Sequence, residues 1–293
     1  MIEIERLTKR YRTGAAVDRV SFSARPGRVT ALLGASGSGK STVLRVLCEF
    51  ARPTSGSTRV LGVPYARLPH PRRHVGVLLD AASFDPRRSG WDALAWSATL
   101  AGVEPVRIGA VLESVGLTLV EAHRPVRTCS EGMRYRLGVA QALLGDPRVL
   151  VLDEPAPGTD AGGPWLHVLL RRFAAGGGTV LLACSRVADA RPVADDVVVL
   201  SRGRVVAAGP ACEVLGGGRT VARSDDDGRL GRVLDLHGVA HAVTPDGRLT
   251  TGAPPQEVGR LARAAGVVLH ELTTDGVRTL EELVDLAPRT VPA

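Results

Sequence analysis

The chain has 293 residues and a formal net charge of +7, so it can fold as one large domain or two smaller ones, and small single-motif folds are excluded. Its arginines are scattered and aromatic residues make up only 3% of the sequence, which argues against binding single-stranded nucleic acid by base stacking. The 4 cysteines form no C-x-x-C pair, so neither a zinc site nor a disulfide framework is expected, and a reducing cytoplasm fits.

The N-terminal segment Met1–Glu5 alternates apolar and acidic residues, which is unlike a signal peptide. No uninterrupted apolar stretch approaches the roughly 20 residues that a membrane-spanning helix needs. We therefore expect a soluble chain that reaches a membrane only through a partner.

A complete phosphate-binding pattern, G-x-x-x-x-G-K-[ST], follows the apolar run Val29–Leu33, which predicts a buried strand. The glycines of such a loop allow successive backbone N–H groups to surround a phosphate, and the next helix directs its positive end at it. A plain Gly/Ser-rich turn is the weaker interpretation, because a strand and a helix flank the loop. The predicted binding residues are Gly34, Ala35, Ser36, Gly37, Ser38, Gly39, Lys40, Ser41 and Thr42.

Lys40 and Ser41 carry the charge and the metal chemistry of this loop. Apart from Lys40, only Lys9 is a lysine among the 37 basic residues, and a compact ammonium suits a tightly wound phosphate loop better than a planar guanidinium does. Ser41 is placed to offer its hydroxyl to Mg²⁺. The pattern therefore predicts a nucleotide as the ligand.

A second phosphate-handling motif follows the apolar strand predicted at residues 148–152, which ends in Asp153 and Glu154. This is a Walker B pattern. Asp153 can reach the Mg²⁺ shell through water, and Glu154 faces the position of a water that attacks the terminal phosphate. An ordinary acidic turn is the alternative, and the complete phosphate loop in the same chain makes it the weaker one.

The rest of the chain predicts two domains, residues 1–212 and 213–293. In the first, strand and helix signals alternate up to about Pro210, which indicates a mostly parallel sheet covered by helices. A hairpin ends this block, and the Gly-rich and Asp-rich segments that follow it indicate a linker between the two domains. For the second, an α+β module, we predict strands at 232–234, 248–250 and 267–272 and helices at 255–265 and 279–286.

Ser130 and Gly132 form an S-x-G pattern at the start of a predicted helix, between the phosphate loop and the strand that ends in Asp-Glu-Pro. This order of motifs resembles the ATP-binding cassette of ABC transporters over roughly residues 1–210. The resemblance implies an α/β fold: a P-loop NTPase cassette with a mainly parallel sheet, a helical signature subdomain and a small C-terminal α+β extension. It also implies ATP and Mg²⁺ as cofactors.

The same resemblance implies partners and further site residues. Ser130 and Gly132 would contact ATP that is held by a second cassette, in a homodimer or a heterodimer, and a separate transmembrane permease would be driven. Tyr11 stands where the family stacks an aromatic ring on adenine, although such a ring can equally serve packing. The segment 158–160 is similar to the loop that touches the opposite cassette, with Asp160 matching its acid and Thr159 replacing a leucine.

Several positions depart from the family pattern. Asp80 stands in place of a glutamine that touches Mg²⁺ and water, and Ser185 in place of a histidine that contacts the γ-phosphate. We therefore expect Glu154, Ser185 and Asp80 to be the catalytic set and Ser41, Asp153 and Asp80 the metal set. Because a serine lacks the polarising imidazole, we expect hydrolysis slower than in a cassette with all its motifs.

The function implied is an ATP-hydrolysing subunit that energises a permease for export of a small molecule, drug or lipid. Export follows from the second module alone, whose layout resembles the extension on ABC-2 type exporters. The segment from Leu78 to Leu94 is where the family grips a coupling helix of the permease. We expect the chain in the cytoplasm, held at the inner face of the cell membrane by that permease.

Two other functions remain open. An ATP-dependent dimerising switch with little hydrolysis is favoured by Ser185, by Thr159 and by the acidic Glu131 inside the signature. A nucleic-acid-linked cassette is suggested by the basic charge, but the segment between Lys40 and Ser130 contains no sustained heptads. We therefore expect no nucleic-acid partner.

Overall fold

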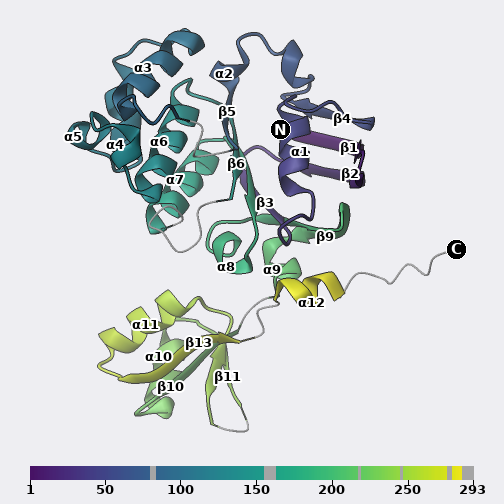
Figure 1. The fold of residues 1–293 in the computed structure, drawn as a ribbon. Coiled ribbons are helices and arrows are strands. Elements are labelled where there is room, and N and C mark those ends of the chain that lie inside the picture. The colour runs from purple at the N-terminus through teal and green to yellow at the C-terminus, as the bar shows by residue number, and fades with distance from the viewer. Residues whose placement is uncertain (80–83, 155–162, 217–218, 245–246, 276–278, 286–293) are drawn as a thin grey trace, which may run out of the picture. The chain divides into compact units, whose positions relative to one another are not determined.

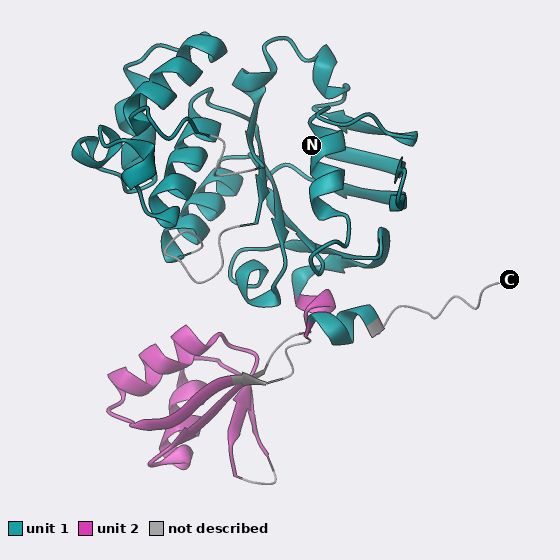
Figure 2. Ribbon diagram, in the orientation of Figure 1, with its two compact units in different colours: residues 1–211, 280–293 teal, residues 212–279 magenta. Residues whose placement is uncertain are grey.

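The computed structural model describes residues 1–79, 84–154, 163–216, 219–244, 247–275 and 279–285. They divide into two compact units, residues 1–211 with helix α12 and residues 212–279 (Figure 2). The strands are β1 (Ile2–Tyr11), β2 (Gly14–Ala24), β3 (Arg28–Leu33), β4 (Ser55–Val60), β5 (Val75–Leu78), β6 (Val149–Asp153), β7 (Thr179–Cys184), β8 (Asp196–Ser201), β9 (Arg204–Pro210), β10 (Arg219–Ser224), β11 (His241–Val243), β12 (Leu249–Thr251) and β13 (Leu269–Asp275).

The helices of the described residues are α1 (Lys40–Leu47), α2 (Pro71–His74), α3 (Gly90–Ala101), α4 (Arg107–Ser114), α5 (Leu119–Ala122), α6 (Glu131–Leu143), α7 (Pro164–Ala175), α8 (Val187–Ala190), α9 (Ala211–Val214), α10 (Asp227–Leu236), α11 (Pro255–Ala264) and α12 (Leu280–Asp285). Single 3-10 turns lie at Tyr65–Arg67 and Val126–Thr128. In the described part of the chain, no helix has the length and apolar character that crossing a bilayer requires.

A six-stranded sheet of order β5-β6-β7-β3-β8-β9 forms the centre of the first unit (Figure 1). Its strands are parallel except for β9, which pairs antiparallel with β8. Every residue of β7 is buried, which explains why its sequence is a continuous apolar run rather than an alternating one. The predicted α/β fold with a mainly parallel sheet is confirmed.

Helix α1 joins this sheet to a second, antiparallel sheet of order β2-β1-β4. The helix contacts β1, β2 and β4 as well as β6, and its residues Leu44 and Leu47 are completely buried. They belong to one hydrophobic core with Ile2 and Leu7 of β1 and Val151 of β6. This packing fixes the helix that begins at Lys40 against both sheets.

Helices α3, α4, α5 and α6 gather beside the central sheet, on the side away from β1, β2 and β4 (Figure 1). Helix α6 packs against α3 and α4 and also contacts β5. Leu94, Ile108, Leu112 and Leu137 are almost wholly buried among these helices. The group is the predicted helical subdomain, and α6 carries Ser130 and Gly132 at its start.

The second unit is an antiparallel sheet of order β11-β12-β10-β13 with two helices, connected as βαββαβ in the manner of ferredoxin-like folds. The strand predicted at residues 232–234 is wrong, because these residues lie inside α10. Asp226 accepts a hydrogen bond from the backbone N–H of Arg229 and so caps the helix, while Leu230 and Leu234 lie one turn apart in the core of the unit.

The predicted module 213–293 differs from the observed division at its far end. Helix α12 contacts β8 and β9 of the first unit, and its Leu283 is completely buried. The chain therefore returns to the first unit after completing the second, which a prediction from sequence order alone places in the same module.

Candidate functional site

The predicted phosphate loop connects the end of β3, at Leu33, with the start of α1, at Lys40. Two of its positions tolerate only glycine. A Cβ atom on Gly39 would lie 2.5 Å from the carbonyl oxygen of Ala16, and the backbone φ of Gly39 is 108°. A Cβ atom on Gly34 would collide with the carbonyl of Leu200. The loop thus fits closely between β2 and β8, which explains the pattern of glycines.

Lys40 is buried, and its ammonium group makes contacts with the loop and with two neighbouring strand ends. Its Nζ donates to the carbonyl oxygens of Gly34 at 2.7 Å and Ala35 at 3.2 Å and to the Oγ of Ser185 at 3.3 Å. It also forms an ion pair with Oε1 of Glu154 at 3.0 Å. The charge of Lys40 is therefore balanced by a carboxylate that comes from a different strand.

Glu154 follows β6 directly and has an unusual backbone conformation. Its φ is 31°, in the left-handed region that non-glycine residues rarely adopt, and its N–H donates to the carbonyl of Ala183 at 3.0 Å. The hydroxyl of Ser185 donates to Oε1 of Glu154. Partial burial raises the pKa of Glu154, but the hydrogen bonds from Ser185 and Lys40 and the Lys40 charge outweigh it, so the pKa is lower than usual.

Asp153, the last residue of β6, lies in a different electrostatic environment from its neighbour. Burial raises the pKa of Asp153 above its ordinary value, and the adjacent Glu154 charge acts in the same direction. A hydrogen bond with Ser41 and the charge of Lys40 act against this shift without reversing it. The two predicted metal residues of the described chain, Ser41 and Asp153, are therefore in contact.

The residues at these strand ends suit a magnesium nucleotide. The Oγ of Ser38 and the Oδ1 of Asp153 are both buried, and neither has a hydrogen-bond partner within the described residues. An anion beside Ser38 and a hydrated cation beside Asp153 would satisfy them. No cluster of three or more His, Cys, Asp or Glu residues that could hold a metal ion by themselves occurs in the described ranges.

Tyr11 ends β1 and pairs with Gly14 across the β1–β2 hairpin. Its side chain is 45% exposed, so it is a surface ring and not part of the core. The carbonyl of Ala16, two residues beyond Gly14, is the group that approaches Gly39 of the phosphate loop. The hairpin that bears Tyr11 therefore borders the loop.

Ser130 and Gly132 lie at the start of α6, in the helical subdomain. Ser130 is exposed and caps the helix by accepting a hydrogen bond from the N–H of Met133 at 3.1 Å, while Gly132 is buried. Glu131 is exposed beside them. In this chain the described contacts of Ser130 are with its own helix, and none of them joins it to the Lys40 site.

Two groups of predicted residues lie outside the described residues. Asp80, predicted for both catalysis and metal binding, is one of them. The other is the segment Gly158, Thr159 and Asp160, which we expected to face a second cassette.

The family resemblance implied that Lys40, Glu154 and Ser185 all lie near the γ-phosphate, but the direct contacts among them were not predicted from the sequence. Glu154 and Ser185 follow β6 and β7 directly, and Lys40 follows the loop at the end of β3; these strands are neighbours in the order β6-β7-β3 although they lie far apart along the chain. Only the sheet topology brings them together. The apolar strand that precedes each of them was the one available signal, because the carboxyl ends of parallel strands meet at one edge.

Comparison with known proteins agrees with this geometry. The sequence profile described as ABC transporter matches residues 17–157, and a profile of a domain of unknown function matches residues 218–281. The Nod factor export ATP-binding protein I of Ralstonia nicotianae is 34% identical over 223 residues, which cover 73% of this chain and 68% of the relative. The methionine import ATP-binding protein MetN 1 of Rhodococcus jostii is 35% identical over 230 residues, covering 73% and 68%.

The fold is also similar to that of solved cassettes. The structure entitled "Dimeric Structure of MJ0796, a Bacterial ABC Transporter Cassette" superposes with a TM-score of 0.65 at 21% identity, over 72% of this chain and 98% of that one. The sequence similarity to curated relatives and this shared fold lead to the same assignment. The chain belongs to the ATP-binding subunits of ABC transporters.

Proposed function

We propose that this chain binds and hydrolyses ATP and thereby energises a separate membrane permease. Proteins of its family generally bind ATP with Mg²⁺ and work as dimers with a transmembrane partner. The observation that carries the proposal is the convergence of Lys40 and Ser41, at the start of α1, with Asp153 and Glu154, at the carboxyl end of β6. Ammonium, hydroxyl and two carboxylates in this arrangement are the groups that phosphoryl transfer requires.

The phosphate loop and the metal pair would hold the nucleotide. Lys40 would exchange its contact with Glu154 for the phosphate oxygens, and the buried hydroxyl of Ser38 would donate to the same group. Ser41 and Asp153 would hold Mg²⁺, directly and through water respectively. The bound ion would neutralise charge that develops on the phosphates during transfer.

Glu154 would position the attacking water and accept its proton. The hydrogen bond from Ser185 lowers the pKa of Glu154 and so favours the ionised carboxylate that a proton acceptor must be. Ser185 contacts that carboxylate and would hold it in place once Lys40 has turned to the phosphates. A hydroxyl is a weaker electrostatic partner for a phosphate than an imidazolium, which supports the expectation of slow turnover.

A second cassette would complete each site. Ser130 caps α6 at an exposed helix start, and the N-terminus of this 13-residue helix favours anions. Because the described contacts of Ser130 are all within its own helix, we propose that it meets ATP held by another copy of the cassette. Gly132 would allow the two backbones to approach closely.

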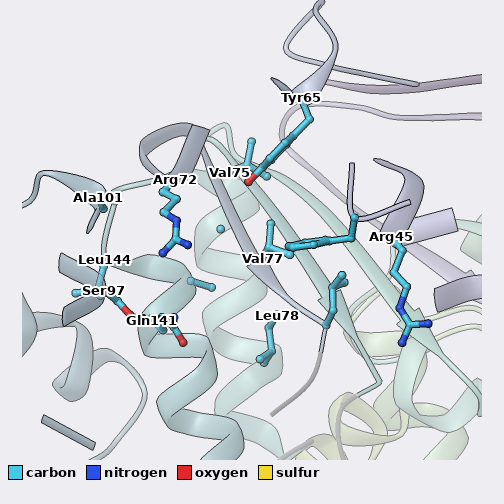
Figure 3. A pocket seen from close by; sticks show the side chains of 15 residues that line it. Arg45, Tyr65, Arg72, Val75, Val77, Leu78, Ser97, Ala101, Gln141 and Leu144 are labelled. Atoms are coloured by element: carbon cyan, nitrogen blue, oxygen red, sulfur yellow. Dashed lines mark hydrogen bonds between the residues drawn. The ribbon is translucent and has the colours of Figure 1, made fainter. Parts of the chain in front are cut away.

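The permease has a candidate docking site in a groove of about 480 Å³ along the edge strand β5. Tyr65 and Arg45 extend from one side of β5, and Ser97 and Gln141 from the helices on the other side (Figure 3). Phe50 in its lining is 69% exposed. Such apolar exposure favours a helix of the permease as the occupant, and Arg45 and Arg72 favour acidic side chains on it.

We further propose that the cargo is exported and that the subunit lies in the cytoplasm, on the inner face of the cell membrane. The relative whose name describes Nod factor export supports this direction. Because a methionine import protein is similar to the chain at about the same identity, the direction has to be measured by transport of cargo in vesicles. The second unit would serve regulation or partner contact. Deleting residues 212–279 removes this unit and tests whether coupling of ATP hydrolysis to the permease depends on it.

The decisive experiment is Mg²⁺-dependent phosphate release by the purified chain, compared with Glu154→Gln at saturating ATP. Turnover that disappears in the variant while ATP still binds supports the ATPase. Turnover that persists in Glu154→Gln contradicts the role given to Glu154.

An ATP-dependent dimerising switch is the second candidate, and the specific observation in its favour is Ser185 at the position between Lys40 and Glu154. The same assay separates the two candidates when the permease is included. ATP binding and dimerisation without phosphate release, even with the permease present, supports the switch.

A further inference from the structure

The ammonium of Lys9 lies over the ring of Tyr11, with Nζ 4.9 Å from the ring centroid. This distance is inside the roughly 6 Å at which a cation is attracted to an aromatic face. The contact covers one face of a ring that is otherwise 45% exposed. Tyr11 is thus a surface ring with a cation over one face, and its exposed part is available to a flat ligand.

Lys9 is itself held by the backbone. Its Nζ donates to the carbonyl oxygen of Arg52 at 2.8 Å, in the connection between α1 and β4. Two more bonds join this connection to β1: the N–H of Arg10 donates to Thr54 Oγ1 at 2.9 Å, and the N–H of Thr54 donates to the carbonyl of Thr8 at 2.8 Å. The end of β1 is therefore fixed to the segment that follows the phosphate-binding helix.

The other side of the same hairpin touches the phosphate loop itself. Lys9 pairs across the sheet with Val17, whose Cγ2 would lie 3.3 Å from a Cβ atom on Gly39. Tyr11 is consequently tied to helix α1 at both ends, through Arg52 beyond the helix and through the loop before it. A ring held in this way has a fixed distance from the phosphate-binding groups.

The chemistry of Lys9 suits this task. Lys9 and Lys40 are the only lysines among 37 basic residues. A compact ammonium can donate to a carbonyl and at the same time present its charge to a ring. Both lysines of the chain lie at the proposed nucleotide site, Lys40 in the phosphate loop and Lys9 over the Tyr11 ring.

We infer that Lys9 is a positioning residue for the nucleotide base: it fixes the Tyr11 ring so that a purine stacks on the face opposite Lys9. The inference rests on the proposed function, since it needs a nucleotide bound at Lys40. It concerns the base and not the phosphates, because the ammonium of Lys9 contacts the Tyr11 ring and the carbonyl of Arg52 and makes no described contact with the loop.

The test compares the affinities of Lys9→Met for Mg-ATP and for Mg-tripolyphosphate, which has the phosphates but no base. We expect the dissociation constant of ATP to rise about two- to fivefold, in keeping with the strength of an exposed cation–π contact. The dissociation constant of tripolyphosphate should stay unchanged, which also shows that the variant is folded. Lys9→Arg, which keeps a cation over the ring, is the matched control and should bind ATP nearly as the parent does.

A double-mutant cycle with Tyr11→Ala isolates the pair. Lys9→Met should have no further effect on ATP affinity once the ring is gone. An equal loss of tripolyphosphate binding, tighter ATP binding by Lys9→Met, or an unaltered effect in the Tyr11→Ala background would each overturn the inference. Failure of the proposed function is distinguishable, because the parent chain would then bind neither ligand and Lys40→Ala would change nothing.

Discussion

Lys40 Nζ lies 3.0 Å from Glu154 Oε1, so the residue expected to bind phosphate is paired with the residue expected to activate water. The two side chains differ in exposure, 3% for Lys40 and 43% for Glu154. Water therefore screens the carboxylate, which can leave the pair, while the ammonium stays in its buried position. Nucleotide binding would free Glu154 by giving Lys40 another anion, and this couples the binding of substrate to the release of the base.

Replacing Lys40 tests the phosphate loop. Lys40→Ala should abolish nucleotide binding, because it removes the one buried ammonium among the described residues of the loop. Lys40→Arg should fail as well, since a planar guanidinium does not fit among the carbonyls of Gly34 and Ala35. Titration calorimetry with Mg-ATP measures both. Unchanged affinity in Lys40→Ala would remove the basis of the phosphate-loop assignment.

Restoring an imidazole tests whether Ser185 limits the rate. Ser185→His should raise turnover, by up to about 10²-fold if a positioned imidazole contributes as general catalysts usually do. The site has room at its open side, because Ser185 is only partly buried. Steady-state phosphate release at saturating ATP is the measurement. No rise would mean that another step is slow, with the permease or the opposite cassette as the next variable to add.

The groove along β5 can be tested through its charge. Arg72→Glu should reduce the amount of permease that copurifies from membranes, because it turns an attractive contact with an acidic helix into a repulsive one. Arg172→Glu on α7 makes the same change of charge away from the groove and should have no effect. Both variants should keep the parent's ATP affinity. Equal losses of permease in the two variants would show an effect of net charge and not of the groove.

The sequence predicts well the parts of this structure that depend on neighbouring residues. The strand before the phosphate loop, the helix start at Ser130 and the strand before Asp153 all lie where local patterns put them. Each is defined within a few residues by apolar runs, glycines and a capping side chain. The fold class of the first unit follows from their alternation.

The parts that escaped prediction depend on long-range contacts. Residues 232–234 have strand-forming composition, yet the packing of Leu230 and Leu234 against the core of the second unit places them in a helix. The contact between Ser185 and Lys40 needs the strand order β6-β7-β3, which no local pattern contains. Helix α12 packs on the first unit, where its Leu283 is buried, and no local sequence pattern indicates this contact.

The adjacent acids Asp153 and Glu154 should affect stability in opposite directions in the absence of nucleotide. Glu154→Gln removes a carboxylate that Lys40 and Ser185 stabilise, so it should lower the melting temperature at pH 7. Asp153→Asn removes a charge that burial makes unfavourable, so it should raise the melting temperature at pH 7. Thermal unfolding of the two variants beside the parent measures this. A fall in both would mean that the buried Asp153 is stabilised by its bond with Ser41 more than it is destabilised by burial.

The pH dependence of these differences should also have opposite signs. The pKa of Glu154 is lower in the folded chain than its unfolded value of about 4.3, so its contribution is complete above that pH and is lost as the pH falls through the folded pKa. The pKa of Asp153 is higher in the folded chain than its unfolded value of about 3.9, so its cost is complete above the folded pKa and disappears as the pH falls towards the unfolded one. Lowering the pH from 7 should therefore shrink the destabilisation of Glu154→Gln only below about pH 4.3, whereas the stabilisation of Asp153→Asn should begin to shrink at a higher pH. Melting temperatures between pH 7 and pH 3 decide the matter, and a gain in Asp153→Asn that persists at the acid end would show a cause other than the buried charge.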